Sequence, residues 1–309
     1  MTDRESVYDG LLGEDTSQWA FGTSFEDPLA GVDITLPDDV DAPVLAAYCL
    51  MLGDDALVYS HRLSQWASNA PDLEDDIALS NIALDLLGQA RLLLARAAAA
   101  DGTCVPVLLQ GSPVPAEDAL AYFRDEADFR NVRLVEPDDV GGPAGDFAVT
   151  IVRLLLFSTY RLALMERLRS SRDPVLAAVA VKAVKEVAYH RDYAGRWFVT
   201  LARGTEESRR RLLAGLGSVW PLHDELFGAH PVETLVAEQG VGVDPSTLAT
   251  HVDVVLAQVL SAAGVEPPTL AQVGPVAGGT GRDGRHSEQM GRLLAEMQSV
   301  ARAHPSGLW

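Results

Sequence analysis

The sequence has little cysteine. Cys49 and Cys104 are the only two in 309 residues, and neither belongs to a Cys-x-x-Cys pair. Two thiols cannot make a disulfide framework, so a reducing compartment is expected. The acidic first ten residues also lack the basic region and apolar core of a secretory signal. We therefore expect a cytoplasmic protein.

Long apolar runs are also scarce. The longest lie around residues 44–52 and 154–157, well below the roughly 20 residues that a membrane-spanning helix needs. The sequence therefore predicts a chain that neither crosses nor coats a membrane.

Basic residues are few. The chain has 24 lysines and arginines against 44 aspartates and glutamates, for a net charge of −20. This balance argues against a nucleic-acid partner, whose phosphates need a basic footprint. Half of this net negative charge lies in residues 1–42, which contain eleven acids and one arginine. Residues 1–43 have no sustained apolar period, so we interpret them as a disordered or surface-draped arm ahead of a single helical domain at 44–309.

Aromatic residues amount to only 6%, whereas alanine and leucine are abundant. This composition favours packed helices over sheets, because alanine and leucine are strong helix formers. Apolar residues recur at helical spacing. The predicted helices cover about 44–68, 73–100, 117–134, 146–170, 174–202, 206–227 (bent at Pro221), 245–263 and 286–303.

Two pairs of long predicted helices have short internal turns and are separated by a crossover of about 45 residues. One long crossover between two helical hairpins is typical of ferritin-like bundles. The sequence therefore predicts an all-α, ferritin-like four-helix bundle with additional C-terminal helices. An α-solenoid is the structural alternative, but the chain has no self-similarity at the repeat lengths of solenoids.

A ferritin-like diiron site takes Glu-x-x-His from each of two helices and one glutamate from each of the other two. On the inward faces of 73–100 and 174–202, the histidine positions are Gln89 and His190. The glutamate positions, three residues earlier, are Leu86 and Val187. Without these carboxylates, two iron ions would face a nearly neutral apolar cage. We therefore predict no metal, no cofactor and no catalytic residue in this chain.

His190 has two interpretations. The first is a core histidine that is hydrogen-bonded to a neighbour. The second is a mononuclear metal site that combines His190 with nearby acids, for which the candidates are Asp54, Asp55, Asp85 and Glu186. Because Asp85 and Glu186 lie one residue off the inward faces, we expect these acids to face solvent or to form ion pairs between helices.

The only two lysines of the chain, Lys182 and Lys185, lie three residues apart in the predicted helix 174–202. They form a basic edge on an acidic protein, which suits an acidic partner or the phosphates of an anionic substrate. The alternative is ordinary pairing along the helix, such as Lys182 with Glu186.

No phosphate-binding loop or nucleophile elbow is present. The glycine-rich residues Gly278-Gly279-Thr280-Gly281 lie between predicted helices. We interpret them as a flexible strap rather than as a nucleotide cradle.

Three stretches together resemble the C subunit of bacterial phenylacetyl-CoA epoxidase, a ring-1,2-epoxidising multicomponent monooxygenase. They are LEDDIALSNIALDLLGQAR (Leu73–Arg91), SRDPVLAAVAVKAVKEVAYH (Ser171–His190) and GGTGRDGRHSEQMGRLLAEMQ (Gly278–Gln298), and the terminal Trp309 fits as well. The resemblance covers roughly residues 44–309, of which LDLLGQAR and KEVAYH are the most specific parts. Residues 1–42 look like an addition to the family pattern.

The resemblance implies a non-catalytic scaffold subunit. In that family a diiron A subunit performs the epoxidation of phenylacetyl-CoA, a small B subunit bridges the pairs, and a reductase supplies electrons from NADPH. The iron is therefore expected in the A subunit, and the process is aerobic phenylacetate catabolism. Two alternatives stay open: an independent ferritin-like metalloenzyme with a site around His190, and a stand-alone helical adaptor.

Overall fold

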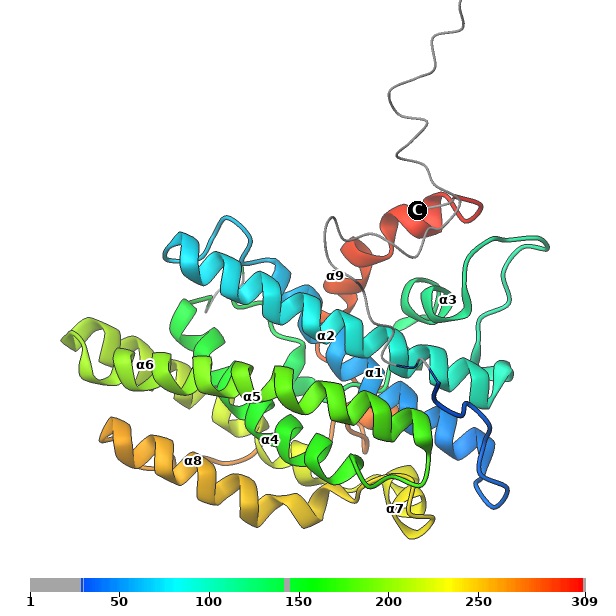
Figure 1. Ribbon diagram of the computed structural model, residues 1–309. Coiled ribbons are helices and arrows are strands. Elements are labelled where there is room, and N and C mark those ends of the chain that lie inside the picture. The colour runs from blue at the N-terminus through cyan, green and yellow to red at the C-terminus, as the bar shows by residue number, and fades with distance from the viewer. Residues whose placement is uncertain (1–28, 30, 142–144, 308–309) are drawn as a thin grey trace, which may run out of the picture.

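The computed structural model describes residues 29, 31–141 and 145–307, and within them it contains helices and loops but no named strand (Figure 1). The fold is all-α, as predicted. Its helices are α1 (Ala42–Ser64), α2 (Leu73–Ala100), α3 (Ala116–Tyr122), α4 (Phe147–Leu168), α5 (Pro174–Arg203), α6 (Glu206–Val219), α7 (Pro231–Glu238), α8 (Ala249–Ala263), α9 (Glu288–Met297) and α10 (Ser299–Ala303).

Two antiparallel hairpins, α1/α2 and α4/α5, form the ferritin-like core. Helices α2 and α5 lie side by side, with α1 and α4 behind them (Figure 1). The crossover between the hairpins spans residues 101–146. Helix α4 lies deepest, because it is covered by α1, α5, α6 and α8, and nearly all of its residues are buried.

Each of the four bundle helices begins at an aspartate. The side chains of Asp41, Asp72, Asp146 and Asp173 accept hydrogen bonds of 3.2, 2.9, 2.8 and 2.8 Å from backbone N–H groups of the first turn. Such a cap satisfies an N–H group that has no partner inside the helix and stabilises it by about 1 kcal/mol. Helix α5 starts at Pro174, as the predicted range 174–202 has it, and Asp173 is its cap.

The predicted helix over 117–134 is wrong. Helix α3 ends at Tyr122, and the chain continues through short 3₁₀ turns. The reason is competition from buried side chains, because the backbone N–H groups of Arg130 and Val132 donate to Asp54 and Asp55 of α1 at 2.9 Å. These carboxylates replace the helical hydrogen bonds that the segment would otherwise make.

The region after α5 also differs from its prediction. The segment 206–227 breaks rather than bends at Pro221, because proline has no N–H group to continue the helix. Helix α7 was not predicted. It starts with His230 as its cap and Pro231 in the first helical position, which is a favoured proline position.

Part of the predicted arm packs on the bundle. Leu36 and Val40 contact the core, and the backbone carbonyl of Ile34 accepts a 2.6 Å hydrogen bond from Arg96 of α2. The first helix begins at Ala42, two residues before the predicted domain start. Residues 1–28 and 30 lie outside the described residues, and the expected disorder of the arm there stays a prediction.

Four helical segments are long and apolar enough to cross a membrane by length and composition alone: α1, α2, α4 and Pro245–Ala263. The uninterrupted apolar runs of the sequence are shorter, because polar residues occur within each of these segments. Burial inside the fold accounts for the apolar character of α4 and α1, whose apolar windows are 94% and 72% buried, whereas the windows of α2 and Pro245–Ala263 are 44% and 28% buried.

Candidate functional site

The predicted inward faces of α2 and α5 are the buried faces. Leu86 and Gln89 of α2, and Val187 and His190 of α5, are all at most 1% exposed. The four positions that were predicted to correspond to the metal ligands of a ferritin-like bundle are therefore buried in the core. Two apolar side chains stand where carboxylates would be needed to hold a dication.

A guanidinium occupies this region of the core. Arg161 of α4 is fully buried, and its Nε donates to Oε1 of Gln89 at 2.9 Å while its Nη1 donates to the carbonyl of Leu52 at 3.3 Å. Burial lowers the pKa of Arg161 to about 10, so it stays protonated at neutral pH. Arg161 therefore holds a fixed positive charge beside the position of a ligand, and this charge opposes the binding of a metal cation.

The amide of Gln89 connects this buried charge to the surface. Its Nε2 donates to Oε2 of Glu186 at 3.0 Å, and Oε1 of Glu186 pairs with Nζ of Lys182 at 2.9 Å. A chain of polar contacts thus runs from Arg161 through Gln89 and Glu186 to Lys182. Arg161 has no ion-paired carboxylate among the described residues, and the charge of buried Asp55 offsets part of the effect of burial, which lowers its pKa.

His190 has one polar partner in the same layer. Its Nε2 lies 3.0 Å from Oδ2 of Asp85, across the α2/α5 contact. This contact agrees with the core-histidine interpretation. Asp85 contacts His190 across the two helices as expected, whereas Glu186 forms its ion pair with Lys182 of its own helix and only a hydrogen bond to Gln89 of α2.

The mononuclear alternative is not supported by the positions of the other acids. Asp54 pairs with Arg124 of the crossover, and Asp55 pairs with Arg282 at 2.9 Å. Both carboxylates are therefore committed to guanidinium groups and are not directed at His190. No group of three or more His, Cys, Asp or Glu side chains in the described part of the chain is placed to hold a metal ion.

The glycine-rich strap, taken with the residues that follow it to His286, packs closely against the bundle at Gly281 and Arg282. Arg282 is 3% exposed and donates to both oxygens of Asp55 and to the carbonyls of Met51 and Arg130. At Gly281 a Cβ atom would lie 2.0 Å from the backbone oxygen of Asn131. The strap therefore passes so close to the crossover that only glycine fits there.

The end of the strap is held by a second buried ion pair. Nδ1 of His286 lies 2.7 Å from Oε1 of Glu136, and both side chains are fully buried. Burial on its own lowers the pKa of His286, but the hydrogen bond and the charge of Glu136 raise it above the ordinary value of 6.5. The contact between His286 and Glu136 thus joins this segment to the crossover.

The two lysines behave differently. Lys182 makes the ordinary pair with Glu186 four residues later. Lys185 is exposed and has no ion pair among the described residues. A role of either lysine in binding a partner or an anion stays a prediction.

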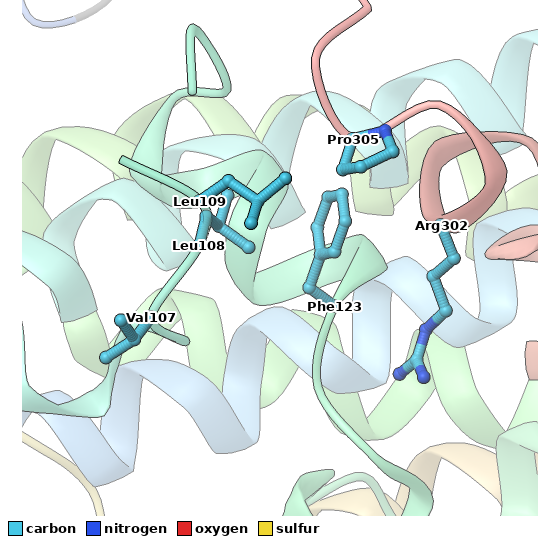
Figure 2. A pocket seen from close by; sticks show the side chains of 6 residues that line it. All are labelled: Val107, Leu108, Leu109, Phe123, Arg302 and Pro305. Atoms are coloured by element: carbon cyan, nitrogen blue, oxygen red, sulfur yellow. The ribbon is translucent and has the colours of Figure 1, made fainter. Parts of the chain in front are cut away.

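A surface pocket lies apart from this polar cluster, between the crossover and the C-terminal segment (Figure 2). It is lined by Val107, Leu108, Leu109, Phe123, Arg302 and Pro305. Its single cationic side chain, Arg302, already donates to the carbonyl of Arg124 at 2.7 Å. None of the lining residues is an acid, a cysteine or a histidine, so the pocket has no group for acid–base or nucleophilic chemistry.

The sequence model of the family described as "Phenylacetic acid catabolic protein" matches residues 33–309. The chain belongs to this family. It is 41% identical over 266 residues to the C subunit of the 1,2-phenylacetyl-CoA epoxidase of Escherichia coli (strain K12). The match covers 86% of this chain and 99% of the relative. The helical bundle, the crossover and the strap all fall within the family match, whereas residues 1–32 fall outside it.

Sequence reasoning missed Arg161, which is the central residue of the cluster. A signal was present, because Arg153 and Arg161 interrupt the otherwise apolar stretch VRLLLFSTYRLALM. A charge in a helix that is apolar on all sides must have buried partners. Applied to this helix, that rule predicts an internal cation.

Proposed function

We propose that this chain is the C subunit of a 1,2-phenylacetyl-CoA epoxidase and that it acts in phenylacetate catabolism. The proposal is supported by the 41% identity to the C subunit of the Escherichia coli epoxidase, which extends over 99% of that protein. Because the chain spans almost the whole relative, the likeness includes the bundle, the crossover and the strap.

Within this complex the chain is a scaffold and not the site of catalysis. The observation that carries this part is the hydrogen bond between Arg161 and Gln89. A buried guanidinium stands where iron would need anionic ligands, and buried acids of α1 are bound to arginines. In this proposal the chain holds no cofactor, works in the cytoplasm, and leaves the oxygen chemistry to a partner.

The partners are a diiron A subunit, a small B subunit and a reductase that takes electrons from NADPH. The contribution of this chain is a rigid surface. Its buried ion pairs connect α1 to the crossover through Arg124, α1 to the strap through Arg282, and α2 to the start of α5 through Arg96. Such pairs fix the relative positions of the elements, because breaking one leaves an uncompensated charge in the interior.

Co-expression of this chain with the neighbouring reading frames tests the proposal. We expect a stable complex that consumes NADPH and oxygen when phenylacetyl-CoA is present, and no turnover by this chain alone. The iron of the complex should remain with the other chains when the components are separated. Conversion of phenylacetyl-CoA by this chain alone would contradict the scaffold role, and the absence of any complex would contradict its membership of the epoxidase.

A further inference from the structure

Helix α2 is apolar on both of its faces. Its buried face packs on the bundle, yet Ile77, Leu84 and Leu87 on the other face are 52%, 63% and 37% exposed. Between Ile77 and Leu92 the only charged residues are Asp85, which contacts His190, and Arg91. A helix that is apolar all round is normally covered on all sides, so the outer face of α2 is unusual for a surface exposed to water.

The neighbouring helix continues this apolar surface. Val181 and Tyr189 of α5 are 49% and 51% exposed, and α5 lies alongside α2 (Figure 1). A Cβ atom on Gly88 of α2 would lie 3.8 Å from Nζ of Lys182, so this lysine reaches across from α5 to α2. We call the surface formed by Ile77, Leu84 and Leu87 of α2 with Val181 and Tyr189 of α5 the α2/α5 outer face. Exposed apolar residues gathered on two neighbouring helices indicate an interaction site.

The charge within this face selects its partner. The molecule carries a net charge of −20 and has only two lysines. Lys182 reaches from α5 to Gly88 of α2, and Lys185 lies on α5 at helical spacing between Val181 and Tyr189. Lys185 is exposed and has no ion pair among the described residues. Lysine among exposed apolar residues fits a protein surface whose apolar residues are flanked by aspartate or glutamate.

Other occupants fit less well. A two-fold contact between two copies, centred on this face, would bring the lysines of both copies together and oppose like charges. An anionic membrane surface would be repelled by the net negative charge of the molecule. A phosphate group would find one lysine without an ion pair among the described residues, Lys185, because Lys182 is paired with Glu186, and a lone ammonium lacks the bidentate fork of an arginine.

We propose that the α2/α5 outer face is the docking surface for another protein of the same complex, one that presents an apolar helical surface edged with carboxylates. This inference rests on the proposed function, because it requires a partner chain. It places the contact directly over the cluster of Arg161, Gln89 and Glu186. Docking would therefore cover Lys182, the outer end of that cluster.

Zero-length cross-linking with a carbodiimide tests the proposal in the co-expressed complex. The amines of this chain are Lys182, Lys185 and the N-terminus, so each cross-link through one of its amines has few possible origins. We expect Lys185 to be joined to an aspartate or glutamate of the partner, and its acetylation to slow at least tenfold in the complex relative to the free chain. Cross-links of Lys185 only to a second copy or to this chain's own acidic residues, or equal acetylation in both states, would overturn the proposal.

Substitutions give an independent test. Leu84→Glu and Lys185→Glu should each weaken association with the partner at least tenfold, while the thermal midpoint of the free chain stays unchanged because both side chains are exposed. Val254→Glu on α8 is the matched control, since Val254 is 53% exposed on another helix, and it should change association less than twofold. If the wild-type complex forms and Leu84→Glu associates normally, the docking surface is wrong while the proposed function stands. If the wild-type chain forms no complex, the proposed function itself fails.

Discussion

Replacing Arg282 by alanine should destabilise the protein strongly, because this guanidinium is the only cation paired with Asp55 among the described residues. Asp55 is fully buried and Arg282 is 3% exposed. A second buried acid, Glu233, lies 3.6 Å from Nε of Arg282. Burial alone would lower the pKa of Arg282, but Asp55 and Glu233 raise it above its ordinary value. Arg282 therefore stays charged over the whole physiological range.

The magnitude follows from what remains after the change. Asp55 would keep the N–H group of Val132 as a donor and lose both hydrogen bonds from Arg282. Removing one partner of a buried ion pair costs about 3–5 kcal/mol. The entropy of unfolding is roughly 2.1 cal/mol/K per residue, so for about 275 described residues this corresponds to a fall of about 5–9 °C in melting temperature.

Denaturant titration and calorimetry of Arg282→Ala, Asp55→Ala and the double variant measure the effect. We expect the double variant to be more stable than the sum of the single changes implies, since it leaves no unpaired Asp55 carboxylate. The control is Arg172→Ala, whose pair with Asp39 is exposed and should contribute less than about 1 kcal/mol. Strictly additive losses, or equal losses for Arg282→Ala and Arg172→Ala, would refute the reasoning.

Two further outcomes are expected. His286→Gln should lower the free energy of unfolding most at low pH. Glu136 raises the pKa of His286 above 6.5 in the folded protein. The stabilisation by this contact is therefore complete below about pH 6.5 and is lost as the pH rises through the folded-state pKa. If the difference in denaturation midpoint between wild type and His286→Gln instead grows from pH 6 to pH 9, this pH dependence is wrong. Gly284→Ala should lower the melting temperature more than Gly264→Ala. Both glycines have a positive φ, but a Cβ atom at Gly284 would lie 2.3 Å from a backbone oxygen, whereas a Cβ atom at Gly264 would meet no other atom within 4 Å. Equal melting temperatures for the two variants would show that the backbone at Gly284 does not pack tightly against the crossover.

The long helices could be predicted from the sequence because their signals are local. The helix over Leu73–Ala100 has an aspartate cap, a continuous apolar face and a following break, and its predicted range is confirmed. The buried faces of α2 and α5 were also predicted correctly, since Gln89 and His190 are buried as expected. Period and capping depend on neighbours within a few residues, which a single sequence contains.

The interior contacts could not be predicted because they join distant segments. The segment after Tyr122 has helical periodicity, but Asp54 and Asp55, more than 70 residues earlier, bind its backbone. The strap appeared flexible because of its glycines, yet these glycines allow the backbone to approach the crossover. The partners of Arg161 likewise lie on other helices, and periodicity does not reveal which side chains meet across a bundle.

We propose that arginine, and not iron, organises the interior of this bundle. The direct test is the iron content of the purified chain after anaerobic loading with ferrous iron and removal of excess metal, compared with the same measurement on Gln89→Glu and Arg161→Leu. We predict much less than one iron per chain for the wild type, because Arg161 opposes the cation and Leu86 and Val187 provide no ligand. Two irons bound per wild-type chain, lost on substitution of His190, would contradict the account.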